Sequence, residues 1–452
     1  MLRTKQCYFR THVNQQSYYQ TVFRVLFQSK RVACQIIPRT WITWRLCFII
    51  TLNIFFNAAH ATSPNAQLNL QLQSLIQQEQ KKYQLPALSV SIQLPGGKNV
   101  RNYVTGTYTL KSQKSITPDT LMQIGSITKT ITASIILQLV EQHKLELTDT
   151  IGEFLPQYPR WKKISIYNLL SHTSGIYNFS ISTSFDKMIR QFPNKEWTLK
   201  EIADLAYRHS NLFQPGKKYQ YTNSDYILLG LILEKVEHQS NQEIFDHYLK
   251  KYHFANTFYT PSGYPDTIKS RISHGYNRDG TLTYNEDATY YTESWGQSAG
   301  AMTSTPEDID HWLAQLFANK IISPDSLAKM TTVISEDNAL LINLNNLHPE
   351  KFAKNKFTEI GSGLGIGLIY FPHYGFVWAH SGGTLGYESF FTYNPCNGII
   401  VVLFYSVKPK QQLIFTEIAS DIFKVIDSSN EIKDQIIKFQ KNQKIPSFCK
   451  FR

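Results

Sequence analysis

Ser126 and Lys129 stand three residues apart in the segment MQIGSITKTITASIILQLV, residues 122–140, where an apolar stretch begins. Side chains three residues apart lie on one face of a helix, so a lysine amine at 129 can reach a serine hydroxyl at 126. Burial among isoleucines disfavours the ammonium form, and a neutral amine can take a proton from a serine nucleophile. The free N–H groups of a helix start, here preceded by Gly125, favour developing negative charge. The alternative is that Ser126 only caps the helix and Lys129 points into solvent.

The S-x-x-K spacing alone is weak evidence, because the chain contains it four times. The other three pairs lack both a preceding glycine and a following apolar helix; they are Ser184–Lys187, Ser326–Lys329 and Ser447–Lys450. Context therefore selects Ser126 and Lys129 as the candidates for nucleophilic chemistry.

Two further motifs could complete a site. Tyr221-Thr222-Asn223 is the only Y-x-N in the chain, and we expect the phenol and the amide, on alternate positions of an extended turn, to point the same way. His380-Ser381-Gly382-Gly383 lies on an expected strand, where glycines let a backbone or ligand approach closely. The alternatives are ordinary turn chemistry for the first motif and a β-bulge with an incidental histidine for the second.

A rival nucleophile motif is the G-x-S-x-G sequence at residues 296–300, followed by Asp308 and His380 in the chain order of an α/β-hydrolase triad. That motif needs a buried apolar strand before the serine and a helix beginning at it. The preceding residues, EDATYYTESW, are polar, and the next helix signal is Thr305-Pro306. The context therefore argues against Ser298 as a nucleophile.

The elements that must position these residues follow from the periodicity. We expect a helix over 66–83, a β-hairpin over 87–94 and 99–110, helices in the middle such as 227–239 and 305–317, strands from 364 to 406, and a final helix over about 411–427. Strands at both ends and helices between them predict an α/β fold of the α+β type. One antiparallel sheet (about 85–110 and 364–427) is flanked by helices, with a mostly helical subdomain inserted at about 130–355.

Taken in order, the three motifs resemble those of the serine β-lactamase and penicillin-binding-protein superfamily: S-x-x-K, then S/Y-x-N, then K/H-T/S-G. The tyrosine in the second motif points to the branch of class C β-lactamases, D-Ala-D-Ala carboxypeptidases and related esterases. The resemblance runs from about residue 70 to 425 and includes LLSHTSGI (169–176), QPGKKYQYTN (214–223) and GQSAGAMTSTPEDIDHWL (296–313). It implies a β-lactamase/transpeptidase-like fold.

The resemblance also implies roles for the motif residues. Ser126 would be the acylated nucleophile and Lys129 would help to deprotonate it. Tyr221 would act as general base and acid, its phenol pKa lowered by the neighbouring lysine, and Asn223 would hold the substrate's amide. The backbone N–H groups of Ser126 and Gly383 would form the oxyanion hole.

His380 and Gly382 would contribute to substrate binding. His380 departs from the lysine usual in β-lactamases and matches the histidine found among carboxypeptidases and esterases, which weakens an interpretation as an antibiotic-resistance enzyme. We expect His380 to recognise a substrate carboxylate or polar end. His172 matches a family segment but no catalytic element, so we expect a structural role for it.

The chain has 452 residues, 42% apolar composition and a formal net charge of +12. Residues 1–61 hold eight lysines and arginines and no acidic residue, which leaves 38 basic and 34 acidic side chains in the rest. The positive charge therefore lies mainly in the N-terminal tail, and the folded part gives no support to nucleic-acid binding.

The tail itself predicts export. An apolar run from Leu46 to Phe56 is followed by an Ala-x-Ala cleavage signal ending at Ala61. We interpret residues 1–61 as a signal peptide with a long basic n-region and 62–452 as the hydrolase domain, periplasmic or secreted. The alternative is a retained anchor, the one case in which we expect membrane contact.

Five cysteines occur, three of them (Cys7, Cys34 and Cys47) in the tail. Cys396 and Cys449 could form a disulfide in an oxidising compartment, or remain two buried thiols. The sequence contains no CxxC and no HExxH, so we expect neither a metal nor a cofactor.

The sequence thus predicts an exported, monomeric serine hydrolase acting through an acyl-enzyme on D-Ala-D-Ala-type peptides or small esters, with peptidoglycan among the candidate partners. One alternative is a weak class C-like β-lactamase. The other is a non-catalytic family member that binds cell-wall peptides.

Overall fold

The computed structural model describes residues 64–96, 100–352, 357–372, 374–443 and 445–450. The expected signal peptide, with Cys7, Cys34 and Cys47, lies outside the described residues. Within the described ranges, no helix is long and apolar enough to cross a membrane.

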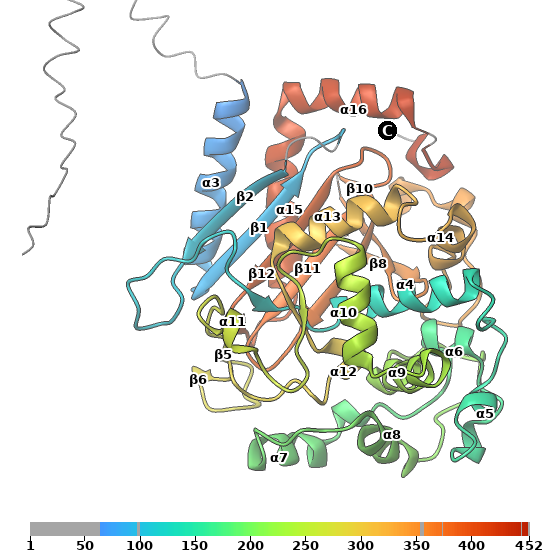
Figure 1. Cartoon of the computed structure of the whole chain (residues 1–452). Helices are drawn as coiled ribbons and strands as arrows, with labels where there is room; N and C mark the ends of the chain where they lie inside the picture. Colours follow the sequence, from blue (N-terminus) through green and yellow to red (C-terminus); the bar gives the residue numbers. More distant parts are fainter. Residues whose placement is uncertain (1–63, 97–99, 353–356, 373, 444, 451–452) are drawn as a thin grey trace, which may run out of the picture. The chain divides into compact units, whose positions relative to one another are not determined.

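A seven-stranded sheet joins the two ends of the described chain (Figure 1). Its spatial order is β2-β1-β12-β11-β10-β9-β8, and every neighbouring pair is antiparallel. The strands are β1 (Ala87–Gln93), β2 (Val100–Gly106), β8 (Thr358–Ser362), β9 (Gly367–Phe371), β10 (Gly375–Gly383), β11 (Glu388–Tyr393) and β12 (Ile400–Tyr405). The pairing of β1 with β12 places Leu88 opposite Tyr405, so residues more than 300 apart in sequence form one ladder.

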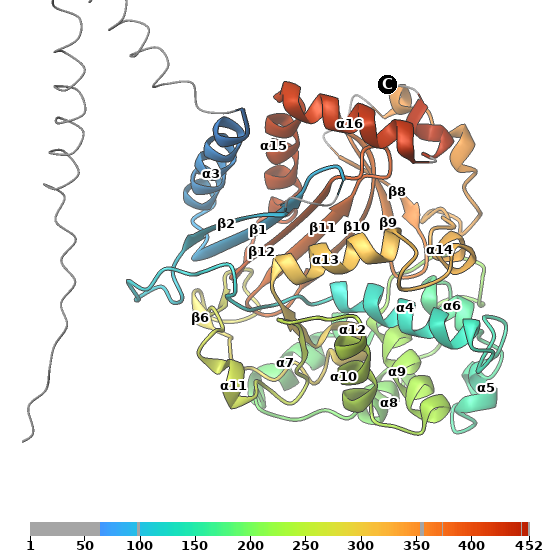
Figure 2. The same cartoon turned by 45° about the horizontal axis from the view of Figure 1, so that its top comes forward.

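Helices cover both faces of this sheet (Figure 2). The helices α3 (Pro64–Lys82) and α15 (Ile414–Ser428) pack on one face, and α16 (Asn430–Asn442) follows α15. The other face packs against α4 (Ile127–Glu141) and α13 (Pro306–Phe317). In β12, Val402 belongs to the core on the α4 side while Val401 and Leu403 belong to the core on the α15 side. This two-sided burial explains why β12 is a continuous apolar run rather than an alternating one.

The segment between β2 and β8 is mostly helical. It contains the small three-stranded sheet β3-β7-β4 and two strands of a second one, β13-β5-β6, whose third strand, β13, follows β12. The helices, in addition to α4 and α13, are α5 (Ile151–Phe154), α6 (Ile166–Leu170), α7 (Thr183–Gln191), α8 (Leu199–Tyr207), α9 (Asn223–Glu237), α10 (Asn241–Lys251), α11 (Asp266–Lys269), α12 (Gln297–Gly300) and α14 (Pro324–Met330). The short strands are β3 (Met122–Gln123), β4 (Phe258–Tyr259), β5 (Tyr276–Asn277), β6 (Glu286–Asp287), β7 (Met302–Ser304) and β13 (Val407–Lys408).

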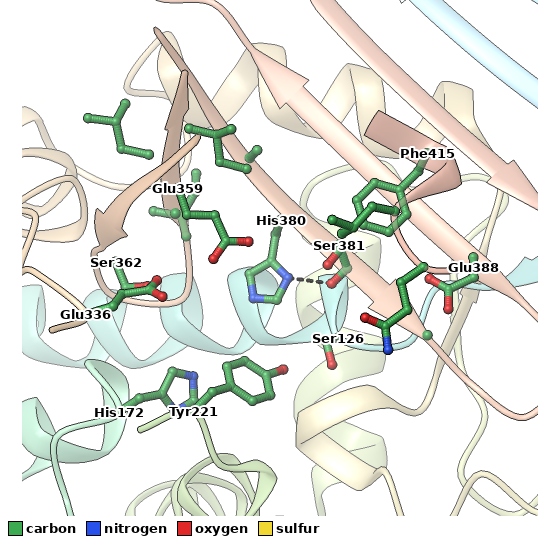
Figure 3. Close-up of a pocket in the computed structure, with 18 of the residues that line it drawn as sticks. Ser126, His172, Tyr221, Glu336, Glu359, Ser362, His380, Ser381, Glu388 and Phe415 are labelled. Carbon is green, nitrogen blue, oxygen red and sulfur yellow. Dashed lines mark hydrogen bonds between the residues drawn. The ribbon is translucent and has the colours of Figure 1, made fainter. Parts of the chain in front are cut away.

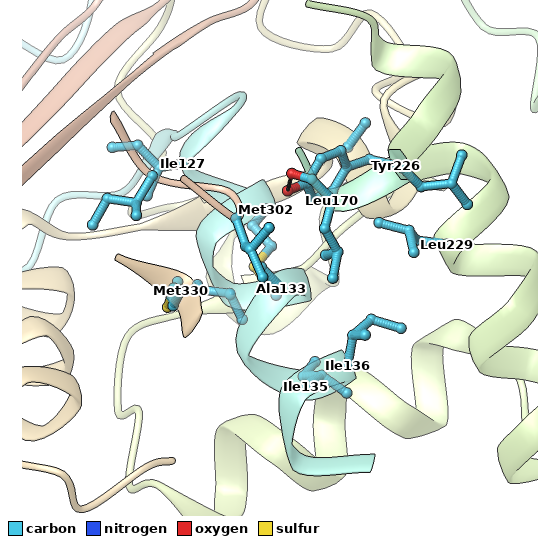
Figure 4. Close-up of a cluster of buried hydrophobic side chains, with 14 of the residues drawn as sticks. Ile127, Ala133, Ile135, Ile136, Leu170, Tyr226, Leu229, Met302 and Met330 are labelled. Carbon is cyan, nitrogen blue, oxygen red and sulfur yellow. Dashed lines mark hydrogen bonds between the residues drawn. The ribbon is translucent and has the colours of Figure 1, made fainter. Parts of the chain in front are cut away.

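Helix α4 lies at the centre of the helical region, and it is buried along nearly its whole length. Figure 4 shows its isoleucines among side chains from several other elements, including Leu170, Tyr226 and Met302. A helix that is apolar on all sides is stable only when it is enclosed in this way. Its first turn, with Ser126, is therefore held rigidly between the sheet and the inserted helices.

The predicted fold class, an antiparallel sheet from both ends of the chain with helices inserted, is confirmed. Several elements were not predicted, namely β8, an edge strand of sequence TEIGS, helix α16 and the short strands of the two small sheets. The domain boundary at residue 62 stays a prediction. Of the two alternatives for the cysteines, the structure has the disulfide, which joins Cys396 in the β11–β12 turn to Cys449 near the C-terminus.

Candidate active site

Ser126 occupies the N-cap position of α4, yet its side chain makes no capping hydrogen bond. Its backbone is already helical, with φ −66° and ψ −5°, whereas a capping side chain needs an extended backbone at that position. The hydroxyl is therefore not used to cap the helix, and its oxygen lies 3.0 Å from Nζ of Lys129. The alternative that Ser126 is only a cap does not fit this geometry.

Lys129 is completely buried, with no exposed surface. Its Nζ lies 2.7 Å from Oδ1 of Asn223 and 2.7 Å from the backbone oxygen of Ala299. Burial holds the pKa of the amine well below its ordinary value, although the nearby Asp225 acts in the opposite direction. A neutral amine has two N–H groups and one lone pair. Because Asn223 and Ala299 accept the two N–H groups, the lone pair is left for the hydroxyl of Ser126.

Asn223 is the first residue of α9, not part of an extended turn as we expected. Thr222 caps that helix, its hydroxyl accepting a hydrogen bond from the backbone N–H of Ser224. One N–H of the Asn223 amide donates to the hydroxyl of Ser180, 2.8 Å away. An amide NH₂ has two donors, so a second N–H remains for a substrate carbonyl.

Tyr221 lies in the loop just before α9 and is hydrogen-bonded to Ser126. The expected lowering of its pKa by the lysine is wrong: burial raises the pKa of the phenol, and the hydrogen bond to Ser126 offsets this only in part. The physical reason is that the phenol is itself buried, and burial disfavours the charged phenolate more than the hydrogen bond favours it. Tyr221 is therefore a proton donor at neutral pH.

The glycines of β10 bring the sheet against the start of α4. A Cβ atom on Gly382 would lie 1.9 Å from the carbonyl oxygen of Ile124, and one on Gly125, at φ +49°, would lie 2.7 Å from the backbone nitrogen of Gly383. Only glycine allows this approach. It sets the N–H of Gly383 beside the first turn of α4, where the N–H of Ser126 begins the helix.

His380, in the middle of β10, packs its ring into the same site. Its Nδ1 lies 2.6 Å from the carbonyl oxygen of Ser381. Burial, reinforced by Lys129, lowers the pKa of His380 to about 4. The imidazole is thus neutral at physiological pH, with its proton on Nδ1 because a carbonyl accepts only from an N–H.

A cavity of about 740 Å³ opens beside these residues, and it is lined by Ser126, Tyr221, His380 and Gly383 among others (Figure 3). The structure therefore brings together Ser126, Lys129, Tyr221, Asn223, His380, Gly382 and Gly383 from four separate elements. The disulfide of Cys396 and Cys449 does not line this cavity.

The rival motif has a different role. Ser298 is buried and its hydroxyl donates to the backbone oxygen of Tyr226, so it is not available as a nucleophile. Asp308 instead accepts hydrogen bonds from Asn256 and Thr257. Ala299, the residue after Ser298, supplies the carbonyl that positions Lys129. The other S-x-x-K pairs also differ in burial, because Lys187 and Lys329 are both exposed.

Sequence reasoning missed several groups that support the site. Ser180 belongs to no motif, and Ala299 lies in the G-x-S-x-G segment but acts through its backbone carbonyl; only tertiary packing brings them to Asn223 and Lys129. Asp225 could have been singled out as an acidic residue in an apolar helix two positions after Asn223. It is fully buried, bonded to Ser174, and 3.3 Å from Nδ1 of His172. The ring of His172 packs against Tyr221 at 4.5 Å between centroids, which agrees with the structural role expected for it.

Within the described ranges, no group of three or more His, Cys, Asp or Glu side chains is arranged to hold a metal ion.

The sequence matches the profile of the Beta-lactamase family over residues 72–416, well over half of the chain. Among characterised proteins, it is 28% identical over 249 residues to Protein flp of Staphylococcus aureus, covering 54% of this chain and 48% of the relative. It is 26% identical over 223 residues to a teichoic acid D-alanine hydrolase of Staphylococcus aureus, covering 46% of this chain and 49% of the relative. The chain thus spans about half the length of the curated relatives it matches.

A solved structure with the same fold is the D-amino acid amidase of Ochrobactrum anthropi SV3. The TM-score is 0.64 at 22% identity, with 83% of this chain and 99% of the amidase covered. At this identity, the likeness concerns the fold.

Proposed function

The chain belongs to the Beta-lactamase family, and from that membership and the site geometry we propose that it is a serine hydrolase acting through an acyl-enzyme on Ser126. The observation that carries the proposal is the set of three contacts around the buried Lys129. Two carbonyl oxygens accept hydrogen bonds from its Nζ, and Oγ of Ser126 lies 3.0 Å from the same nitrogen, close enough for the hydroxyl proton to pass to it.

Acylation begins when Oγ of Ser126 attacks the carbonyl carbon of the substrate. The hydroxyl proton passes to Nζ of Lys129, and the new oxyanion accepts the N–H groups of Ser126 and Gly383. The bond to the leaving atom then breaks as the Tyr221 phenol protonates that atom. Tyr221 recovers a proton from the Lys129 ammonium, so the catalytic groups return to their starting protonation states. Asn223, with one free N–H, holds the acyl part.

Deacylation reverses these roles. A water molecule attacks the acyl carbon, its proton goes to the same base, and the acid product leaves as the hydroxyl of Ser126 is restored. No metal or cofactor takes part in any step of this proposal.

The substrates we propose are D-Ala-D-Ala-type peptides or small esters with a D-configured acyl group. Two relatives support this class by name, one an amidase of D-amino acids and the other a hydrolase of D-alanine on teichoic acid. The histidine at 380, where β-lactamases have a lysine, favours these substrates over β-lactams. A β-lactam would acylate Ser126 with little turnover.

We further propose that the protein is exported and works as a monomer in the cell envelope, with peptidoglycan among its candidate partners. The relative that acts on teichoic acid supports an envelope location. The disulfide between Cys396 and Cys449 also supports it, because such bonds persist in oxidising compartments.

A hydrolysis panel tests this function. The full chain and its Ser126→Ala variant are compared on a D-Ala-D-Ala peptide, an N-acetyl-D-alanine ester and a chromogenic cephalosporin. We expect ester or peptide hydrolysis that is lost in the variant, with slow or no release from the cephalosporin. Hydrolysis that persists in Ser126→Ala would contradict the proposal, and rapid cephalosporin turnover would favour a β-lactamase instead.

A further inference from the structure

The two sides of a bound substrate can be told apart in the structure. This distinction rests on the proposed function, because it uses Tyr221 as the group that protonates the leaving atom. Tyr221 and His380 line the large cavity. Asn223 and Gly383 also line a separate hollow of about 180 Å³, walled by Phe185, Ile189, Leu282 and Trp295. If Asn223 holds the acyl part, as proposed above, that part lies toward this hollow, which is also lined by the charged residues Asp186, Arg190, Asp279 and Lys408, and the leaving group extends into the large cavity past Tyr221 and His380.

His380 offers the leaving group a hydrogen-bond acceptor and no donor. Its single proton is held on Nδ1 by the carbonyl of Ser381, 2.6 Å away, so Nε2 carries a lone pair. Figure 3 shows this second nitrogen turned away from Ser381, into the part of the pocket that contains Tyr221 and Glu359. A carboxylate placed there would meet a lone pair. The expectation that His380 recognises a substrate carboxylate therefore does not fit the tautomer that the structure fixes.

Two carboxylates line the same end of the cavity. Glu359 on β8 and Glu336 both face it, next to Ser362, whose hydroxyl donates to Glu336 at 2.7 Å. Among the described residues, neither carboxylate has a cationic side chain within ion-pair distance. Their charges are close enough that Glu336 helps to raise the pKa of Glu359 beyond the effect of burial. Among the described side chains, this end therefore has two carboxylates and no cation paired with either of them.

An independent observation concerns His172, which lines the same cavity. Its side chain is only 4% exposed, and its Nε2 is buried with no hydrogen-bond partner among the described residues. A buried polar atom without a partner is costly, so it marks a place where a bound molecule or a water completes the site. The lysines of the cavity come from another part of the chain: Lys408 ends β13 and is paired with Glu388, and Lys410 follows in the segment before α15.

From these contacts, we propose that the leaving-group end of the cavity, formed by His380, Glu359 and Glu336, binds a positively charged leaving group, namely an alcohol, thiol or amine that carries an ammonium. Of the two substrate classes proposed above, it therefore favours the esters, because it discriminates against a leaving group that ends in a carboxylate, such as the terminal D-alanine of a D-Ala-D-Ala peptide. The preferred substrates are then D-acyl esters or amides of cationic alcohols or amines.

Three thioesters that share an N-acetyl-D-alanyl group test this selectivity in the full chain. Their thiols are thiocholine, which is cationic, its uncharged 3,3-dimethylbutyl analogue, and 3-mercaptopropionate, which is anionic. Thiol release gives kcat/KM for each. We expect the cationic ester to exceed the neutral one by about tenfold, and the neutral one to exceed the anionic one by a similar factor, as for partly desolvated charge pairs.

Glu359→Gln should reduce the cation-to-neutral ratio to about twofold, and Glu336→Gln provides a second variant with the same expected direction. Asp337→Asn, which removes the same charge from a neighbouring residue outside the cavity lining, should leave all three rates unchanged. Added salt should lower the cationic preference of the unmodified protein.

A wild-type enzyme that hydrolyses the three esters equally, or prefers the anionic one, would overturn this inference and leave the acyl-enzyme proposal standing. A cation-to-neutral ratio that stays at the wild-type value in both glutamine variants would also overturn this inference. No turnover of any ester, together with no acyl adduct on Ser126, would instead overturn the proposed function on which the inference rests.

Discussion

The backbone nitrogen of Gly383 lies so close to Gly125 that a methyl group on residue 125 would come within 2.7 Å of it. This contact joins strand β10 to the turn that begins α4, and it brings together the two residues, Ser126 and Gly383, whose backbone N–H groups we propose as the oxyanion hole. The sheet, built from the two ends of the chain, thus meets the inserted helices at the proposed active site.

Gly125→Ala should therefore impair catalysis more than folding. The added methyl group pushes Gly383 away, and the loss of one oxyanion donor typically lowers kcat by about 10²- to 10³-fold. Ester kcat/KM and thermal unfolding are measured together. The matched control is Gly263→Ala, which also has positive φ, +99°, but open space around its Cβ position. Equal activity in the two variants would contradict the role given to this contact.

Lys129→Met should abolish turnover and change how stability depends on pH. The pKa of Lys129 is lower in the folded protein than in the unfolded chain, where it is about 10.5. Between these two pKa values the unfolded state binds the extra proton, so this residue makes stability rise with pH, by up to about 1.4 kcal/mol per unit. Urea unfolding at several pH values from neutral up to about pH 10, below the unfolded-state pKa, should show a smaller slope of stability against pH in Lys129→Met.

Lys187→Met, in another S-x-x-K pair, is the control for that experiment. Its side chain is exposed, so the slope should match that of the unmodified protein. If Lys129→Met also kept the wild-type slope, Lys129 would be charged in the folded state and could not act as the base.

Tyr221→Phe should discriminate between substrates by their leaving groups. Because burial keeps the phenol protonated, its role is to donate a proton to the leaving atom. An N-acetyl-D-alanine methyl ester needs that proton, so its kcat/KM should fall by about 10²-fold or more. The p-nitrophenyl ester has a stable leaving anion and should lose less than about tenfold. Equal losses on both esters would show that Tyr221 does not act as the acid.

Cys449→Ser should lower stability without affecting activity. The bridge to Cys396 spans 53 residues, and a closed loop of that length contributes about 4 kcal/mol in the chain-entropy account. Neither cysteine lines the cavity, so ester kcat/KM should stay at the wild-type value. Urea unfolding with and without a reductant measures the effect. Identical midpoints for the variant and the oxidised wild type would contradict a stabilising disulfide.

The sequence allowed the fold to be predicted where local signals and burial agree. Thr305-Pro306 predicted the start of α13 because a capping hydroxyl and a proline mark a first turn, and that helix runs from Pro306 to Phe317. Helix α9 begins at Asn223, four residues before its apolar pattern, because a polar first turn leaves no periodic signal. Strand β8 was missed because TEIGS, at a sheet edge, contains one large apolar residue.

The site shows a similar division. The motifs indicated Ser126 with Lys129, and Tyr221 with Asn223, because the two members of each motif are close together in sequence. The second contact of Lys129, with the carbonyl of Ala299, depends on tertiary packing and on a backbone atom that any residue would supply. The direction of the Tyr221 pKa was predicted wrongly, because the burial of the phenol, which raises its pKa, depends on tertiary packing that the motif does not reveal.

The central claim is that Ser126 is acylated with Lys129 as its base, and intact-protein mass spectrometry after treatment with a fluorophosphonate tests it most directly. We expect a single covalent adduct that maps to Ser126. It should be absent from Ser126→Ala and persist in Ser184→Ala, where the serine of another S-x-x-K pair is removed. An adduct that survives Ser126→Ala, or the absence of any adduct on the folded wild-type protein, would contradict it.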